Sequence, residues 1–141
     1  MAAHSIMSSL KNLKLAQKAV IQQQEVIREL DALVDDIERC ETTIVALKSE
    51  LEAVNERHKN RKTTREDIAY LTDLLKCANK KLTWEKHIAS LQKRTPATLE
   101  RMSRMINDPK NPPSDELRAA MLKSLQGIQQ AMERLQAVKV E

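Results

Sequence analysis

An apolar column that repeats every seven residues constrains this chain more than any other feature. It lies in the stretch 6–58, which contains no Gly, Pro or Phe, and it consists of Ala16, Gln23, Leu30, Ile37, Ile44 and Leu51. A seven-residue period is typical of a helix whose apolar seam packs on another helix. At about 1.5 Å per residue, about 50 residues make a rod of roughly 75 Å, which cannot bury its seam alone. The stretch therefore predicts a long helix with partner helices, inside the chain or outside it.

A companion column changes sides along the same stretch. It consists first of Leu13, Val20, Ile27 and Val34, and then of Leu33, Cys40, Leu47 and Val54. The seam therefore rotates near residues 33–41, which indicates a change of packing partner or an irregular repeat. Loose heptad spacing in a globular bundle is the alternative. Gln23 interrupts the main column, and it either fixes register or partner choice or marks a less buried part of the helix.

Aromatic residues are almost missing from the sequence, which has one Trp, one Tyr and no Phe. Aromatic side chains supply much of the buried area in globular cores and in ligand pockets. A compact enzyme core is therefore hard to build here, whereas a narrow seam between helices needs none. One Gly and four Pro provide little turn material, so we expect few, long elements.

The stretch 58–67 contains no apolar residue and separates the long helix from the next apolar segment. Thr63 and Glu66 fit a capping box ahead of an apolar run that begins at Ile68. These features predict a turn, with one continuous helix as the alternative. The stretch is also basic, through Lys59, Arg61, Lys62 and Arg65. Such a cluster is either a contact for an acidic partner, a nuclear-import signal or simply a solvated loop.

The next helix carries two neighbouring apolar columns. One is Ile68, Leu71, Leu75, Ala78 and Leu82, and the other is Tyr70, Leu74, Cys77, Trp84, Ile88 and Leu91. A helix with one partner needs one stripe, so two stripes predict at least two neighbouring helices. Trp84, which lies among charged residues, either anchors an interface or closes the edge of the bundle.

A second helix that folds back on the first would cover it only to about residue 28. The N-terminal third, with Leu10, Leu13, Val20 and Ile27, would then have no internal partner unless later segments reach it. We expect this third to be a surface that binds a partner.

The remaining sequence predicts two further helices. Thr95 and Pro96 are typical of a helix start, so a short helix is expected over 96–106. The loop 107–113 contains three of the four prolines, and Ser114 then caps a last helix.

The predicted fold is all-α: an elongated coiled coil or antiparallel helical hairpin that extends into a small bundle of about four helices. Its parts are a long coiled-coil helix over 1–62, a second helix packing back on it over 63–94, and a C-terminal helical segment over 95–141.

The sequence offers no constellation of catalytic residues. His4, His58 and His87 are far apart, and Cys40 and Cys77 form no metal-binding motif, so we expect no metal site and no cofactor. The two cysteines fit a reducing compartment, and no run reaches the roughly 20 apolar residues of a membrane span. We therefore expect a non-enzymatic, soluble protein of the cytoplasm or nucleus that is not secreted.

These features favour a structural or adaptor subunit that binds partner helices by coiled-coil pairing within a multiprotein assembly. Small subunits of cytoskeletal, kinetochore, centrosome, tethering and chromosome-organising complexes have this architecture. The expected partners are other coiled-coil proteins, in a hetero-oligomer in preference to a homodimer. The expected partner-binding seam is Leu13, Val20, Ile27, Leu30, Val34, Ile37, Ile44 and Leu51.

The alternative function is a nucleic-acid or chromatin-associated factor that uses the basic stretch 59–65. Acidic residues interleaved in the second helix and the shortage of stacking aromatics argue against it. A helix that lies on a membrane surface also fits poorly, because the polar faces mix acids with bases.

Overall fold

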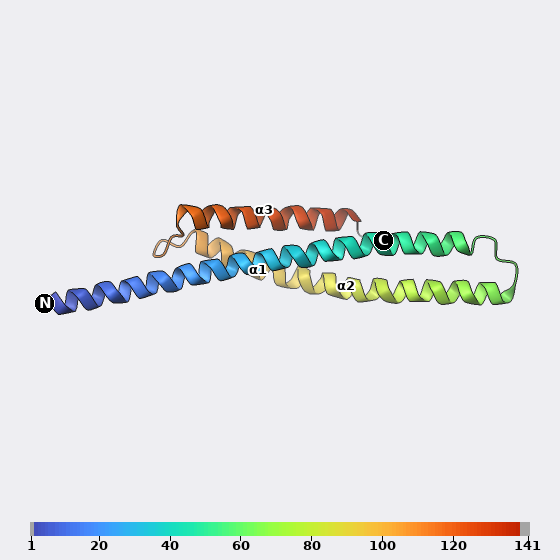
Figure 1. The fold of residues 1–141 in the computed structure, drawn as a ribbon, viewed down its shortest axis with the longest axis horizontal. Helices are drawn as coiled ribbons and strands as arrows, with labels where there is room; N and C mark the ends of the chain where they lie inside the picture. Colours follow the sequence, from blue (N-terminus) through green and yellow to red (C-terminus); the bar gives the residue numbers. More distant parts are fainter. Residues whose placement is uncertain (1, 139–141) are drawn as a thin grey trace. The chain divides into compact units, whose positions relative to one another are not determined.

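The computed structural model describes residues 2–138, with side chains from Ile6 onward, and these residues form three helices. Helix α1 spans Ala2–Arg57, α2 spans Thr64–Ile106 and α3 spans Asp115–Val138 (Figure 1). No strand occurs within residues 2–138. The prediction of an all-α fold is therefore confirmed.

Local capping residues set the starts of α2 and α3. The Thr63 hydroxyl accepts a hydrogen bond from the Glu66 backbone N–H at 3.1 Å, and the Glu66 carboxylate accepts one from the Lys62 N–H at 2.9 Å. At α3, the Ser114 hydroxyl accepts from the Leu117 N–H at 3.3 Å. These bonds satisfy N–H groups that a helix start leaves without partners. The turn after α1 and the capping roles of Thr63 and Ser114 are confirmed.

Helix α2 continues through Thr95 and Pro96, where the sequence predicts the start of a separate helix. The described residues thus form three helices rather than about four. A proline inside a helix removes one hydrogen bond and costs roughly 3 kcal/mol relative to Ala. Pro96 is exposed, whereas Thr95 and Met102, seven residues apart on one face, are buried. Burial of that face on both sides of the proline outweighs the local signal for a break.

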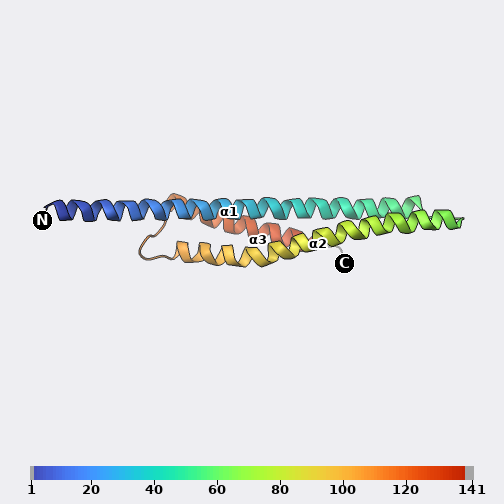
Figure 2. The ribbon, with the colours of Figure 1, turned by 90° about the horizontal axis from the view of Figure 1, so that it is seen from below.

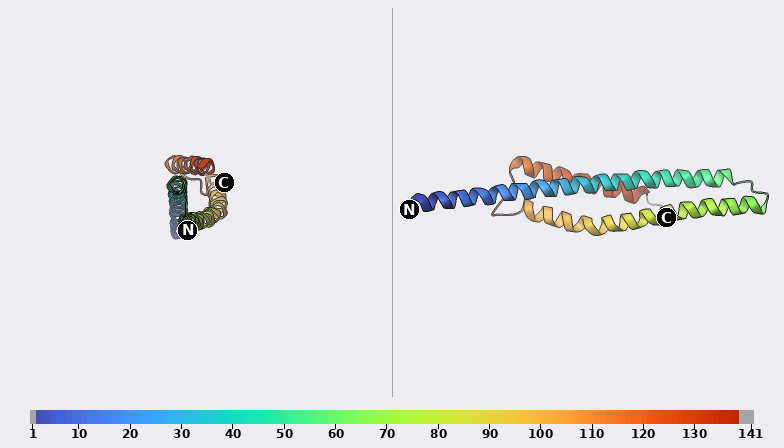
Figure 3. Two further views of the ribbon diagram at one scale, coloured as in Figure 1. Left: turned by 90° about the vertical axis from the view of Figure 1, so that its right-hand side faces the viewer. Right: turned by 60° about the horizontal axis from the view of Figure 1, so that its bottom comes forward.

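The chain divides into two compact units, each of which contains parts of all three helices. Unit 1 consists of Met1–Val34 and Arg94–Gln129. Its α1 and α2 are linked by an ion pair between Glu29 and Arg101 at 3.0 Å, and the loop from α2 to α3 lies within it (Figure 3). Its apolar core consists of Val26, Leu30, Leu33, Met102, Met121 and Ile128.

Unit 2 consists of Asp35–Lys93 and Gln130–Glu141. Here α1 and α2 run side by side in opposite directions from the turn that joins them (Figures 1 and 2). Glu50 pairs with Lys80 at 2.8 Å, and the Tyr70 hydroxyl donates to Asn55 at 2.7 Å. The apolar cluster between the two helices consists of Leu47, Leu51, Val54, Tyr70, Leu74 and Cys77.

Helix α3 joins unit 2 through its last turns. The Arg134 guanidinium lies 3.3 Å from the Glu38 carboxylate and 3.2 Å from the Glu41 carboxylate, both on α1. On the same helix, Ala131 and Leu135 are buried. The ion pairs of this part of α3 therefore join it to α1.

Candidate helix-binding surfaces

The N-terminal part of α1 exposes large apolar side chains. Over residues 6–21 they are between 40% and 70% exposed: Ile6, Met7, Leu10, Leu13, Leu15, Val20 and Ile21. Four of these, Ile6, Leu10, Leu13 and Val20, lie along one side of the helix at heptad spacing, and we call them the N-terminal stripe. Of the three other large side chains, Met7 and Ile21 flank the stripe, whereas Leu15 lies on the opposite side of the helix. A stripe of this kind on an exposed helix is a candidate surface for a partner helix.

The structure divides the predicted partner-binding seam into exposed, buried and half-buried members. Leu13 and Val20 are exposed, whereas Leu30 and Ile37 are 0% exposed and Ile44 is 4% exposed. The remaining members, Ile27, Val34 and Leu51, are half-buried. The buried members already have partners inside the chain, so the surface left for an external helix is concentrated before residue 22.

A segment after α2 covers α1 from Gln23 onward, beyond the residue 28 to which the second helix alone was expected to reach. Gln23 is only 4% exposed, and its Nε2 donates to the Asn111 carbonyl oxygen at 3.1 Å. Asn111 lies in the proline-rich loop between α2 and α3. A contact across 88 positions of sequence cannot be read from a local pattern. Of the two interpretations of Gln23, a less buried stretch of helix is therefore wrong.

The side-chain oxygen of Gln23 is buried and has no hydrogen-bond partner among the described residues. A buried carbonyl without a partner costs about 1–3 kcal/mol, and one hydrogen bond contributes about 1 kcal/mol. Gln23→Leu removes both the cost of the unpaired oxygen and the gain from the hydrogen bond. The carbonyl oxygen of the half-buried Asn111 can then accept a hydrogen bond from water in place of Gln23. We expect this variant to raise the unfolding free energy by about 1 kcal/mol, measured by urea denaturation.

The exposed neighbour Gln24 supplies the matched control for this prediction. Gln24→Leu should change the unfolding free energy by less than about 0.5 kcal/mol. A loss of stability in Gln23→Leu would instead show that the amide contact with the loop outweighs the unpaired oxygen.

A second stripe of exposed apolar side chains lies on α2. Ile68, Leu71, Leu75 and Leu82 are between 51% and 62% exposed, and Ala78 is exposed with them. Their spacing alternates strictly between three and four residues, as in a coiled-coil seam. We call these five residues the α2 stripe.

The two columns of α2 have different environments within unit 2. Leu74 and Cys77, in the column next to the α2 stripe, pack on α1. The four large members of the stripe are exposed, and Ala78 borders a hollow beside Leu47 and Leu51 of α1. The sequence predicted a neighbouring helix for each of the two apolar columns of α2. Within the described part of unit 2, the column of Leu74 and Cys77 has such a neighbour, whereas the large side chains of the α2 stripe are exposed. Sequence reasoning assigned the stripe to an internal helix and so missed it as a candidate binding surface. Its three-four spacing was the available signal.

The predicted basic contact residues at the turn have separate roles. Arg61 donates to Asp67 at 2.9 Å and to the His58 carbonyl oxygen at 2.8 Å, and its guanidinium carbon lies 4.0 Å from the centre of the Tyr70 ring. Arg61 therefore holds the turn together. The side chains of the other members form no ion pair within residues 6–138 and are exposed: Lys59, Lys62 and Arg65.

A charged cluster joins the end of α1 to α2. The Asp73 carboxylate lies 2.9 Å from His58 Nε2 and 2.6 Å from Arg57 Nη2. The hydrogen bond with His58, followed by the one from Arg57, lowers the pKa of Asp73 below its ordinary value of 3.8. The ionised carboxylate is thus the form that the folded turn favours.

The lowered pKa of Asp73 makes this end of unit 2 sensitive to acid. The folded state binds a proton at Asp73 more weakly than the unfolded state does. The contribution of Asp73 to the unfolding free energy is therefore full above pH 3.8, and it is lost as the pH falls through the lower pKa of the folded state. We expect Asp73→Asn to lower stability at neutral pH and to flatten its decline below pH 3.8. Urea denaturation at a series of pH values measures both effects. Parallel pH profiles for the two proteins would contradict this role.

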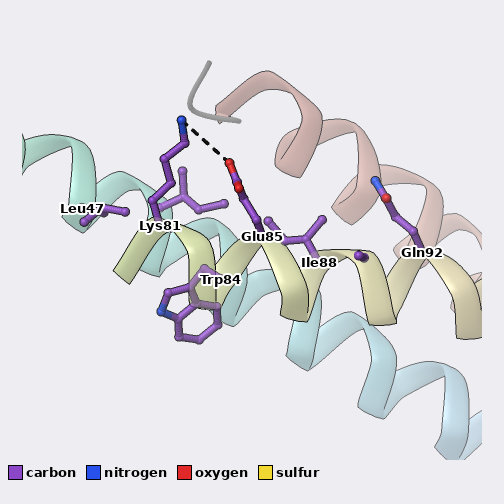
Figure 4. Close-up of a pocket in the computed structure, with 8 residues that line it drawn as sticks. Leu47, Lys81, Trp84, Glu85, Ile88 and Gln92 are labelled. Atoms are coloured by element: carbon purple, nitrogen blue, oxygen red, sulfur yellow. Dashed lines mark ion pairs between the residues drawn. The ribbon is translucent and has the colours of Figure 1, made fainter. Parts of the chain in front are cut away.

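Trp84 borders a small hollow in unit 2, about 230 Å³ in volume, with Ile44 and Leu47 of α1 on its other wall. The indole is half-buried and meets the His87 ring edge-on, with 5.3 Å between centroids. In Figure 4 it points away from the Lys81–Glu85 ion pair. The hollow is smaller than the roughly 300–1,000 Å³ of typical ligand pockets. An anchoring role for Trp84 in an interface stays a prediction.

The titratable core residue Cys40 is buried in unit 2. Burial, with a further contribution from the Asp36 carboxylate, raises the pKa of its thiol, which favours the neutral form.

Within the described residues, no three His, Cys, Asp or Glu side chains are grouped so as to hold a metal ion. No helix over the same residues has the length and apolar character needed to cross a bilayer.

Comparisons with protein family models, with curated proteins and with solved structures found no match to this chain.

Proposed function

We propose that this chain is a structural or adaptor subunit of a multiprotein assembly and that it binds partner helices by coiled-coil pairing. The observation that supports the proposal is the exposure of large apolar side chains at heptad spacing on α1 and on α2. Extended apolar stripes that stay in contact with water are typical of unoccupied interaction surfaces. In this proposal, the paired parts of α1 and α2 in unit 2 form an antiparallel coiled-coil hairpin that holds the fold.

The partners that suit this function are other coiled-coil chains, in an assembly of cytoskeletal, kinetochore, centrosome, tethering or chromosome-organising type. The free thiols of Cys40 and Cys77 agree with a place in the cytoplasm or nucleus. The predicted seam contributes in two ways. Leu13 and Val20 belong to the exposed surface, and its buried members, such as Leu30 and Ile37, preserve the helices that present that surface.

The native mass of the species that contains this chain in a cell extract tests the proposal. We expect a stoichiometric complex of several polypeptides, which re-forms when the purified partners are mixed with the purified chain. Size-exclusion chromatography with light scattering measures both masses. A species with the mass of a single chain in the extract would contradict an adaptor function. Binding to duplex DNA that weakens steeply with salt, without a protein complex, would favour the nucleic-acid alternative.

A further inference from the structure

The α2 stripe has a basic edge. Thr72, Asn79 and Lys86 each lie four residues after a member of the stripe. They therefore border the stripe on the side away from the column that packs on α1. Lys76 lies four residues after Thr72, and Arg65 lies three residues before Ile68. All of these edge residues are exposed, and none of them is acidic.

The bases on this edge differ from other lysines of the same helix. Lys80 pairs with Glu50 at 2.8 Å, and Lys81 lies 3.8 Å from Glu85. By contrast, no ion pair within residues 6–138 involves the bases of the edge, which are Arg65, Lys76 and Lys86. Along this edge the α2 stripe is therefore bordered by positive charge that the described chain does not neutralise. On its other side, Asp67 and Glu85 pair with Arg61 and Lys81.

We propose that the α2 stripe binds an amphipathic helix of a different polypeptide, whose apolar seam is flanked by Glu and Asp residues. This inference rests on the proposed function and deepens it by giving the place and the charge of one partner helix. Apolar contacts along the stripe supply the affinity, while carboxylates of the partner pair with Lys76 and Lys86 and select it over other helices.

A second copy of this chain is a poor occupant of the stripe. If two copies paired in opposite directions about the middle of the stripe, Arg65 of one would lie opposite Lys86 of the other, and like charges repel. The N-terminal stripe is unsuitable as well, because residues 2–24 contain three lysines and no Asp or Glu. The acid-rich part of α1 already uses its seam inside unit 2, where Ile37 and Ile44 are buried. Charge complementarity therefore points to another chain.

A matched pair of designed helical peptides tests the proposal with the full-length chain. Both peptides carry the same leucine seam, and the positions that flank the seam are all Glu in one and all Lys in the other. We expect the Glu peptide to bind about tenfold or more tightly than the Lys peptide at low salt, with a smaller difference at high salt. Fluorescence anisotropy measures both affinities. Equal affinities would overturn the assignment of an acidic partner.

Two double variants separate the apolar from the charged contribution. Leu71→Gln with Leu75→Gln should weaken binding of the Glu peptide at least about a hundredfold, because two anchors are lost. Lys76→Glu with Lys86→Glu should weaken it about tenfold and should improve binding of the Lys peptide. Leu122→Gln on α3 is the control, because Leu122 is an exposed leucine outside the stripe. It should leave both affinities unchanged.

The native complex distinguishes a failure of this inference from a failure of the proposed function. A complex that keeps every one of its partner chains in Leu71→Gln with Leu75→Gln leaves the adaptor function standing and overturns the α2 site. Binding to anionic vesicles or duplex DNA that the same variant abolishes would also overturn it, by assigning the stripe to a membrane or to nucleic acid. A chain that is alone in the extract contradicts the proposed function itself, whatever the peptides do.

Discussion

Ile37→Asp is expected to abolish the cooperative unfolding transition of unit 2. Ile37 is 0% exposed on the buried face of α1, together with Cys40 and Ile44. The substitution removes a buried apolar side chain, which costs about 2–5 kcal/mol, and it adds the cost of placing a carboxyl group in the core. Their sum is comparable to the roughly 5–15 kcal/mol that stabilise a typical domain. Helical circular dichroism during urea denaturation measures the loss.

Two substitutions on the same helix calibrate this result. Ala46→Asp places the same carboxylate at an exposed position and should cost less than about 1 kcal/mol. Ile37→Val keeps the site apolar and should cost about 0.5–1.5 kcal/mol. An Ile37→Asp protein whose urea midpoint matched that of Ala46→Asp would show that Ile37 is not in the core.

Burial of Leu30 and Ile37 changes how loss of a complex should be interpreted. In the sequence both belong to one seam with Leu13 and Val20, so an acidic substitution at any of them would appear to test partner binding. In the structure, Leu30 and Ile37 are buried, and their substitution acts first on folding. Only the exposed members can separate binding from stability.

Local signals in the sequence were sufficient for the helical class and for several helix ends. A capping hydroxyl and its backbone partner are only three residues apart at Thr63 and at Ser114, so the pattern contains the whole interaction. Similarly, the heptad columns show which residues share a face of α1, because side-chain direction follows from helix geometry alone.

The sequence did not show which apolar faces are covered inside the chain. Periodicity gives the same pattern for a stripe that meets an internal helix and for one that meets solvent, so the α2 stripe was assigned to an internal neighbour. Burial of Gln23 depends on a loop 88 positions away, and continuation of α2 through Pro96 depends on packing around Thr95 and Met102. These outcomes are set by contacts distant in sequence, which no local pattern contains.

In the proposed assembly, Leu13→Asp combined with Val20→Asp is expected to release this chain from the partner helix of the N-terminal stripe without unfolding it. Both side chains are exposed, at 55% and 40%, so the substitutions should change the unfolding free energy by less than about 1 kcal/mol. In a coiled-coil seam, however, each would place a carboxylate in a desolvated contact, at a cost of several kcal/mol. Together they should lower partner affinity by more than about a thousandfold. Native mass in the extract and the urea midpoint measure the two effects.

Asn12→Asp combined with Gln22→Asp is the matched control for this experiment, because it adds the same two charges to exposed positions away from the N-terminal stripe. It should leave the complex intact. If both double variants released the chain, added negative charge on the segment would be the cause, and a specific seam would not be needed. If neither released it, the N-terminal stripe would not be an essential contact. The two double variants add the same charge at exposed positions in the same segment of α1 and differ only in the face of the helix that carries it. Release by the stripe variant alone, with an unchanged urea midpoint, would therefore assign the binding energy to one face of α1.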